Sequence, residues 1–319
     1  MADAVAALGE WQDDDTSIGD VLDNLHRLRG SDRTATRTSV VTLVGVARDA
    51  DELQRACDAG ETLGGRHPGR TIVVHALEDE PEGLEARVRL IEGSADGARV
   101  WSEDVTLTVK GPAARHLDSL IEPLTLPELP LAVWYVGTCP APDDALCETA
   151  EVVLVDSKEI GGPEGFAELL DVGRSHALID LTWVRLMPWR LLMAGLFEGR
   201  VYRPYVSKVE RASVRGKPGV RDLLGGWLAS RLDLADVDLT DDKHAFMELV
   251  AGDGTFTVER RDDERLVRAA ARIHGGPGHE ELLPLPDTTL VWSLAEALSD
   301  LEGDRVYGEA LEAALSFAR

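Results

Sequence analysis

An apolar run, a helical segment and a second apolar run follow one another closely in the first quarter of the chain. Residues 39–47 (SVVTLVGVA) form a continuous apolar stretch, as expected of a strand that is buried on both faces. Residues 49–63 have the pattern of a helix, and residues 71–77 give the next strand. This order and spacing predict a right-handed strand–helix–strand crossover in a mainly parallel sheet.

Residues 16–170 are predicted to form one α/β domain around this crossover. Ser17 and Asp20 make a capping-box signature at the start of a helix. Residues 85–92 and 99–110 alternate between apolar and polar side chains, which predicts an antiparallel hairpin added to the sheet and makes the sheet mixed. The remaining predicted elements of this domain are a helix at 113–124 and strands at 131–136 and 152–155.

Residues 171–319 are predicted to form a second domain of the α+β class, with the boundary near Asp171. Pro188 either kinks a helix or opens the first turn of a new one. Residues 1–15 are polar and aperiodic and are expected to be flexible. The predicted elements are helices at 166–170, 183–197, 220–232, 290–301 and 305–317, an extended segment at 201–214, and an antiparallel meander at 245–250, 255–260 and 265–273.

The chain has 319 residues and a formal net charge of −25, which bounds its partners and location. The negative charge disfavours nucleic acid, because the phosphates would be repelled. The longest apolar runs fall well short of the roughly 20 residues that span a bilayer, so no membrane partner is expected. The acidic N-terminus does not resemble a secretory signal, and three cysteines fit a reducing compartment, so the cytoplasm is the expected location.

Residues 63–70 (LGGRHPGR) combine glycines with cations just before a strand. A phosphate cradle is one interpretation, since glycines expose backbone N–H groups and Arg66 and Arg70 flank them. However, a P-loop or a dinucleotide fingerprint places its glycines after a strand and before a helix, which is the reverse of the order here. The glycines are also explained as the end of the preceding helix. That interpretation leaves Arg66, His67 and Arg70 unexplained.

Residues 185–221 form a cationic island, with nine lysines and arginines against two glutamates. Two interpretations explain this island equally well. It is either a solvated surface whose cations pair with the protein's own carboxylates, or a surface that binds another protein. The second interpretation draws on neighbouring aromatic residues, because Trp183 precedes Arg185 and Tyr202 precedes Arg203.

Motifs of catalysis and metal binding are not apparent in the sequence. No Cys-x-x-Cys pair occurs, and His279 lacks a second histidine at the spacing of a zinc helix, so no metal site is expected. No Gly-x-Ser-x-Gly nucleophile motif occurs either. We therefore expect no catalytic residues and no bound cofactor.

Three blocks of sequence carry a resemblance to a known family: LGGRHPGRTIVVH at 63–75, LPELPLAVWY at 126–135 and DLTWVR at 180–185. In this order the chain resembles the glucose-6-phosphate dehydrogenase assembly proteins, the OpcA family, over about residues 17–301. The resemblance implies a non-catalytic bacterial protein that binds glucose-6-phosphate dehydrogenase and promotes its active oligomer. It also implies allosteric activation of that enzyme and thereby NADPH supply by the oxidative pentose phosphate pathway.

On this interpretation glucose-6-phosphate dehydrogenase is the partner, and cations with aromatic neighbours are expected to bind it. Two other interpretations stay open. In the first, the same cations bind a sugar phosphate or nucleotide, and the chain is a metabolite sensor. In the second, the chain is a phosphosugar-modifying enzyme, although no catalytic motif in the sequence indicates that activity. The expected partner-binding residues are Arg66, His67, Arg70, Trp183, Arg185, Arg200 and Arg203.

Overall fold

The computed structural model describes residues 6–30, 41–64, 69–95, 98–141, 143–160, 162–260, 266–285 and 288–317. The chain folds into two compact units, and each is assembled from separate stretches of sequence. The sequence suggested a single boundary near Asp171, whereas the chain passes between the units several times. The first unit comprises Met1–Asp156, His176–Ile179 and Leu290–Glu302, and the second comprises Ser157–Ser175, Asp180–Thr289 and Gly303–Arg319.

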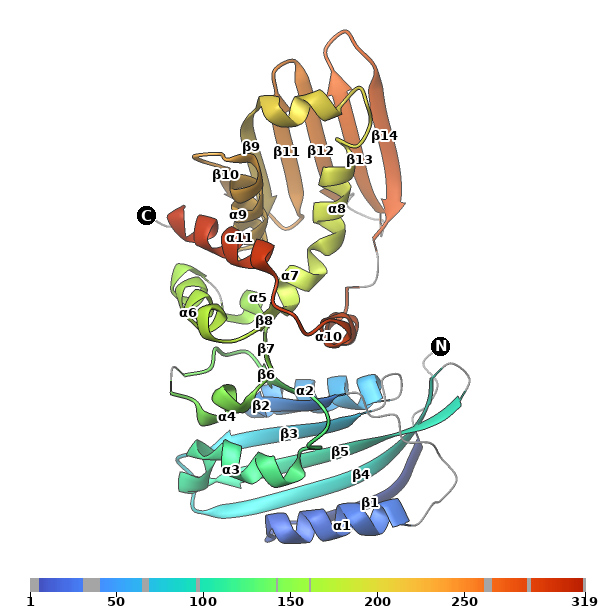
Figure 1. The fold of residues 1–319 in the computed structure, drawn as a ribbon, viewed down its shortest axis with the longest axis vertical. Coiled ribbons are helices and arrows are strands. Elements are labelled where there is room, and N and C mark those ends of the chain that lie inside the picture. The colour runs from blue at the N-terminus through green and yellow to red at the C-terminus, as the bar shows by residue number, and fades with distance from the viewer. Residues whose placement is uncertain are drawn as a thin grey trace. The chain divides into compact units, whose positions relative to one another are not determined.

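The first unit is built on an eight-stranded sheet with the order β1-β4-β5-β3-β2-β6-β7-β8 (Figure 1). Strand β3 pairs in parallel with β2 and β5, and β6 pairs in parallel with β2 and β7. Strand β4 runs antiparallel to β5 and β1, so the predicted mixed, mainly parallel sheet is confirmed. The strands are β1 (Ala6–Asp13), β2 (Thr42–Ala47), β3 (Arg70–Leu77), β4 (Gly83–Ala95), β5 (Ala98–Lys110), β6 (Leu131–Tyr135), β7 (Val152–Val155) and β8 (Leu178–Asp180).

The strand order of this sheet identifies a doubly wound fold. When β1 and β4 are set aside, the other six strands lie in the spatial order 3-2-1-4-5-6 relative to their order in the chain. That is the strand order of the fold that binds dinucleotides. The order reverses between β2 and β6, and folds of this kind bind their ligands at that switch point, beside the carboxyl ends of the strands.

Helices pack on the first sheet as the sequence pattern requires. Helix α2 (Ala50–Gly64) is the predicted crossover and packs on β2, β3 and β5, while α1 (Ile18–Gly30) packs on β4 and β1. The predicted capping box of α1 is confirmed, because the Asp20 amide donates to Ser17 Oγ and the Ser17 amide donates to Asp20 Oδ2, both at 3.2 Å. The other helical segments of this unit are η1 (Gly111–Arg115), α3 (Leu117–Ile121), η2 (Glu122–Leu124), α4 (Ala145–Thr149) and α10 (Leu290–Ser299).

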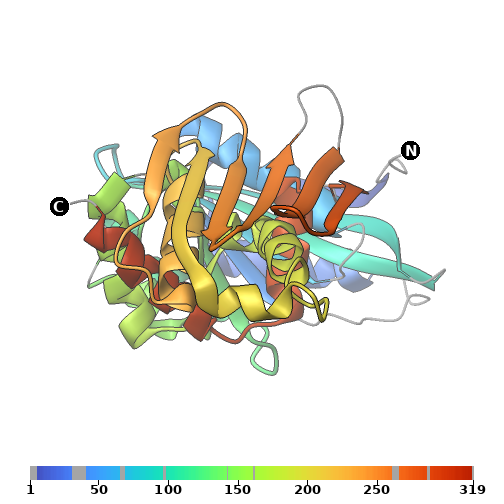
Figure 2. The same ribbon diagram turned by 90° about the horizontal axis from the view of Figure 1, so that it is seen from above.

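The second unit is built on a six-stranded sheet with the order β10-β9-β11-β12-β13-β14 (Figures 1 and 2). All its neighbouring strands are antiparallel except β9 and β10. The predicted meander is therefore confirmed as β11, β12 and β13. The strands are β9 (Val209–Gly216), β10 (Asp238–Asp241), β11 (Phe246–Ala251), β12 (Gly254–Arg260), β13 (Leu266–Ile273) and β14 (Gly278–Pro284).

Helices cover one face of the second sheet. Helix α8 packs on β12 and α9 packs on β9, and α11 packs in turn on α9 and α6. Met247 and Leu249 of β11 are buried towards this face, whereas Glu248 between them is only half-buried, as the period of two in a strand requires. The helical segments are α5 (Ser157–Ile160), α6 (Gly162–Ser175), α7 (Leu181–Arg185), α8 (Met187–Gly195), η3 (Arg203–Lys208), α9 (Val220–Leu232) and α11 (Arg305–Ser316).

Two segments differ from the sequence-based expectation. Within the first fifteen residues, expected to be flexible, Ala6–Asp13 forms the edge strand β1 against β4. An edge strand takes its hydrogen bonds from one neighbour, so it does not need the continuous apolar pattern of a central strand. The expected extended segment at 201–214 is wrong in its first half, where Pro204 opens the 3₁₀ helix η3 before β9 begins.

Prolines also decide how the predicted helices are divided. Pro188 opens the first turn of α8, which is separate from α7, so the second of the two alternatives for this proline is correct. The helix predicted at 113–124 is instead divided into η1, α3 and η2, and Pro123 stands in the first turn of η2. Among the described residues, no helix has both the length and the apolar character needed to span a bilayer.

Candidate functional site

A cleft of about 630 Å³ opens at the switch point of the first sheet. Val46 of β2, Ala76 and Leu77 of β3, and the segment that follows β6 line it. Carboxylates outnumber arginines in its described wall, so its electrostatic potential opposes a phosphate group. The charged lining residues are Arg48, Glu78, Asp79, Glu80, Arg115, Asp143 and Asp144.

The N-terminus of α2 adjoins this cleft, and its own side chains cap it. Asp49 Oδ1 accepts a hydrogen bond from the Glu52 amide at 2.8 Å, and Glu52 Oε2 accepts one from the Arg48 amide at 2.7 Å. Glu52 is buried, and a Cβ at Gly137, just past β6, would overlap Glu52 Oε1. In dinucleotide-binding folds the corresponding helix N-terminus holds the pyrophosphate. Here the carboxylates of Asp49 and Glu52 accept hydrogen bonds from two backbone N–H groups at this point, those of Glu52 and Arg48.

The acidic residue that follows β3 is also engaged. Dinucleotide folds use a carboxylate near this point to bind the ribose hydroxyls. Glu78 follows β3 directly, but its Oε2 accepts a hydrogen bond from Arg115 Nε at 2.9 Å. Both side chains are exposed, so this pair contributes little to stability. The cleft therefore lies where a nucleotide site would be, but two carboxylates, Asp49 and Glu52, stand at the start of the helix that would face a phosphate.

We expect the isolated chain to bind neither NADP⁺ nor NADPH. The Asp49 and Glu52 carboxylates would repel a pyrophosphate, and they already accept hydrogen bonds from the Glu52 and Arg48 amides. Titrating either nucleotide to about 1 mM, roughly the weak end of useful affinity, should leave the melting temperature of the chain unchanged. An NADP-dependent dehydrogenase in the same instrument is the positive control. A saturable increase in the melting temperature of the chain would contradict this assignment.

A tyrosine and a cysteine near the cleft are held in their neutral forms. Tyr135 is fully buried, and its burial together with the nearby Asp144 charge raises its pKa well above the usual value. Burial likewise raises the pKa of the Cys147 thiol to about 11, so the thiol is protonated near neutral pH. Among the described residues, no group of three or more His, Cys, Asp or Glu side chains could hold a metal ion.

Arg70, one of the predicted partner-binding residues, is buried in the first unit. It begins β3 directly opposite Glu103 of β5. Its Nε donates to Glu103 Oε2 at 2.9 Å, and its Nη1 donates to the Leu124 carbonyl. Arg29 reaches the same carboxylate, with Nη2 2.6 Å from Glu103 Oε2. Arg70 therefore ties two strands and the η2 segment together and has no free surface for a partner.

Trp183 is buried in the second unit, where it holds α7 against the start of α11. Its indole Nε1 donates to Asp304 Oδ2 at 2.7 Å, while Asp304 Oδ1 caps α11 by accepting from the Val306 amide. The Arg190 guanidinium stacks on the Trp183 ring at 3.5 Å. Burial lowers the pKa of Arg190 to about 10, even though the Asp304 carboxylate opposes this.

The remaining cations of the island divide into paired and unpaired groups. Arg215 and Arg221 form ion pairs with aspartates of the same unit, and Arg185 is half-buried on α7. Arg200 and Arg203 are exposed, and neither has an ion-pair partner within 4 Å in the part of the chain that the structure describes. Arg66 and His67 lie outside the described residues. Arg200 and Arg203, which are neighbours in the sequence, thus lie exposed on one surface segment. Arg70 is buried in the first unit and Trp183 in the second.

Three residues that organise these positions were not singled out from the sequence. Glu103 carries no local signal, because its partners Arg29 and Arg70 are 74 and 33 residues away. Glu52 stands at the fourth position of an Asp-x-x-Glu capping motif before an expected helix, and that signal was present. Asp304 directly precedes a predicted helix and could have been identified as its N-cap.

Comparisons with known proteins give the family. Residues 61–171 match the family model described as the glucose-6-phosphate dehydrogenase subunit N-terminal domain, and residues 176–311 match the model of its C-terminal domain. A Synechocystis sp. protein that carries the name OpcA and the description OxPP cycle protein is 27% identical over 190 residues. That match covers 56% of this chain and 40% of the Synechocystis protein, so the chain spans less than half of this relative.

Solved structures show only a remote likeness. Glucose-6-phosphate 1-dehydrogenase from Mycobacterium avium has a TM-score of 0.47 at 9% identity, over 87% of this chain and 90% of that one. The 3-ketoreductase KijD10 from Actinomadura kijaniata, solved with NADP, has a TM-score of 0.44 at 12% identity, over 86% and 95%. Similarity at this level carries no argument about function. The two domain models, matched in order along the chain, show that it belongs to the OpcA family of glucose-6-phosphate dehydrogenase assembly proteins.

Proposed function

We propose that this protein is a non-catalytic assembly factor and allosteric activator of glucose-6-phosphate dehydrogenase. The observation that carries the proposal is the ordered match of both dehydrogenase-subunit domain models, at 61–171 and 176–311. The capped N-terminus of α2 supports it, because a chain that opposes a pyrophosphate at its switch point is poorly suited to hydride transfer with a nicotinamide nucleotide.

Activation by such a partner is a matter of differential binding. The protein raises the population of the active dehydrogenase oligomer only to the extent that it binds that oligomer more tightly than the inactive form. A tenfold shift in this equilibrium corresponds to about 1.4 kcal/mol. One or two well-placed contacts supply a difference of that size. The proposed consequence, in the cytoplasm of a bacterium, is greater flow of glucose 6-phosphate into NADPH production.

The predicted partner-binding residues take different roles in this proposal. Arg200 and Arg203 are exposed and are proposed to contact the dehydrogenase directly. Arg70 and Trp183 are buried, so each acts on the partner only through the elements that it holds in place. We also propose Arg66, His67 and Arg185 as contacts with the dehydrogenase, as the sequence predicts.

The proposal is tested by following NADPH formation by the cognate dehydrogenase across a glucose 6-phosphate titration, with and without this protein. Light scattering of the same mixtures reports complex formation. We expect a lower half-saturation or a higher maximal rate, together with a species larger than either component. Unchanged kinetics and no complex, with a dehydrogenase that is active alone, would reject the proposal. Calorimetry of the isolated chain with glucose 6-phosphate separates the metabolite-sensor alternative, which alone expects heat without the enzyme.

A further inference from the structure

Exposed apolar side chains concentrate on one segment of the second unit. Within the part of the chain that the structure describes, six large apolar residues are exposed, and four of them lie between residues 187 and 208. This stretch, here called the α8–η3 segment, runs from the start of α8 to the end of η3. The four are Met187, Leu191, Val201 and Val206, and the other two are Leu8 on β1 and Leu282 on β14.

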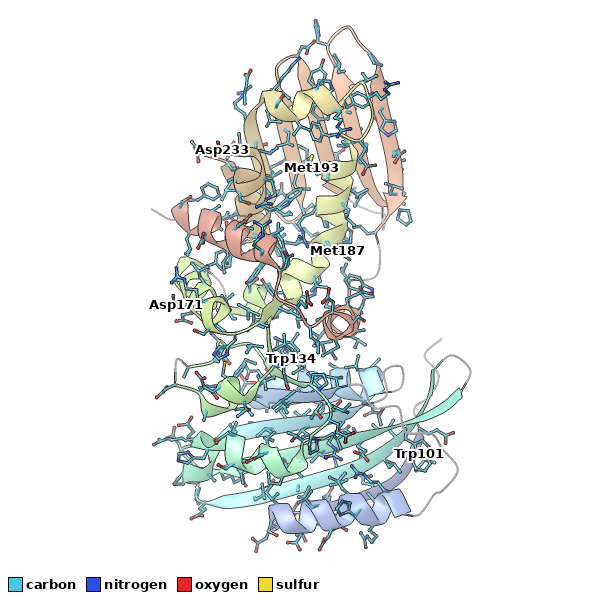
Figure 3. All side chains as sticks on the ribbon, in the orientation of Figure 1. Trp101, Trp134, Asp171, Met187, Met193 and Asp233 are labelled. Atoms are coloured by element: carbon cyan, nitrogen blue, oxygen red, sulfur yellow. The ribbon has the colours of Figure 1, made fainter. Side chains whose placement is uncertain are left out.

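Leu191 is the most exposed of them. Its relative exposure is 64%, and it lies one helical turn after Met187 on α8, so the two side chains share one face of the helix. Met193 of the same helix is buried (Figure 3). Helix α8 therefore has one apolar face packed in the unit and a second apolar face in solvent. Burying this side chain against a partner would remove its apolar surface from water and so favour binding.

The inner side of the segment is firmly anchored. Phe197 stacks on Phe256 of β12 with ring centroids 4.2 Å apart, and Tyr202 and Tyr205 contact the same ring at 6.1 and 5.8 Å. A Cβ at Gly254 would meet the Tyr205 ring at 2.9 Å, so this glycine lets the tyrosine pack closely on the sheet. The exposed residues are thus presented from a fixed scaffold, which lowers the entropy cost of binding through them.

The segment is also cationic without internal compensation. Arg200, Arg203 and Lys208 are exposed, and none has an ion-pair partner within 4 Å among the residues described. The Lys208 ammonium lies 4.9 Å from the centre of the Tyr205 ring. Glu198 is the one acidic residue between 187 and 208 in a chain whose net charge is −25. A surface with apolar side chains beside unpaired cations is complementary to an acidic surface with an apolar centre.

The face of the second sheet opposite α8 provides a contrast. Charged residues of β12, β13 and β14 on this face pair with one another: Arg268 lies in ion-pair contact with Glu259 and 3.7 Å from Glu280, and Arg272 lies 3.5 Å from Glu280. Cross-strand pairing of this kind is typical of a face that remains in water. Arg200, Arg203 and Lys208 of the α8–η3 segment have no such ion pairs among the described residues, and they lie beside exposed apolar side chains.

We propose that the α8–η3 segment docks on an acidic surface of glucose-6-phosphate dehydrogenase, with Leu191 as its apolar anchor and Arg200 and Arg203 as its charge contacts. This inference rests on the proposed function. The dehydrogenase is chosen as the occupant because the segment lies wholly within residues 176–311, which match the C-terminal domain of a subunit of that enzyme. The unpaired cations then define the chemistry that the docking site on the enzyme must supply.

The test compares Leu191→Gln and the double variant Arg200→Glu/Arg203→Glu with two matched controls. Leu282→Gln changes a leucine of 49% exposure in the same unit, and Lys217→Glu reverses an exposed cation outside the segment. Binding to the purified dehydrogenase is measured by titration with light scattering, and melting temperatures confirm that each variant is folded. We expect the dissociation constant to rise at least tenfold for both segment variants and less than twofold for both controls. Raising the salt concentration should weaken wild-type binding more than binding of the arginine double variant.

Each outcome has a distinct meaning. If wild-type protein binds and activates the dehydrogenase while both segment variants bind as it does, the docking surface is wrong and the proposed function stands. If the wild-type protein does not bind at all, the proposed function itself fails. If Leu191→Gln abolishes self-association of the chain without changing its affinity for the enzyme, the segment is an interface between two copies and the inference is overturned.

Discussion

Replacing Glu103 by glutamine is expected to lower the free energy of unfolding by about 3–5 kcal/mol. The Glu103 carboxylate forms ion pairs with the guanidinium groups of Arg29 and Arg70. The side chain of Arg29 is only 15% exposed, that of Arg70 is 3% exposed and that of Glu103 is 12% exposed. The substitution keeps the shape of the side chain but removes the negative charge. Two buried cations would then face each other without compensation, and that is the costly way to break a buried ion pair.

The measurement is urea unfolding followed by circular dichroism, with Asp171→Asn as the control. Asp171 pairs with Arg174 on the surface of α6, where both side chains are mostly exposed. Removing that pair should change the free energy of unfolding by less than about 1 kcal/mol. A similarly small loss for Glu103→Gln would show that the Arg29–Glu103–Arg70 cluster is not a stabilising element.

Gly226→Leu is expected to cost more than about 4 kcal/mol, enough to prevent the second unit from folding. Gly226 lies on α9 where α11 crosses it, and a Cβ there would overlap the Ala310 carbonyl oxygen and lie 2.9 Å from the Ala314 nitrogen. Both are backbone atoms, so no rotamer change relieves the overlap. The two helices would have to separate and give up the packing between them.

Gly308→Ala is the matched control for this variant. Gly308 lies in α11 itself, and nothing is within 4 Å of the Cβ that alanine would add. Alanine favours the helix over glycine by roughly 0.8–1 kcal/mol, so this variant should be slightly more stable than the wild type. Thermal unfolding of both variants distinguishes the effects, which have opposite signs. A soluble Gly226→Leu protein with the wild-type melting temperature would contradict the close approach of α9 and α11.

Local patterns predicted much of the fold, because the signals lie within a few residues of the elements they specify. The capping box of Ser17 and Asp20 and the buried run that becomes β2 are of this kind. The edge strand β1 escaped prediction, since its side chains follow no apolar alternation and its pairing comes from β4. Helix η3, which Pro204 opens, was not predicted; Tyr202 and Tyr205 beside it pack on Phe256, which is remote in sequence.

The positions of the candidate site residues depend on contacts that are remote in sequence. Arg70 reads as a free cation in a loop, but the register of β3 and β5 places it opposite Glu103. Trp183 and Asp304 are 121 residues apart, so the sequence near the tryptophan does not indicate its hydrogen-bond partner. Residue type alone therefore could not separate Arg200 and Arg203, which are exposed, from Arg70, which is structural.

The way α2 is capped has a consequence for regulation. A loop that must close on a nucleotide takes its final form only when that nucleotide is abundant. Asp49 and Glu52 belong to the chain, so the hydrogen bonds that they make at the start of α2 form without a bound nucleotide. If no nucleotide binds there, as predicted above, the first unit does not respond to the redox state of the nucleotide pool. On the proposed function, its influence on a dehydrogenase would then follow the amount of this protein in the cell rather than the ratio of NADPH to NADP⁺.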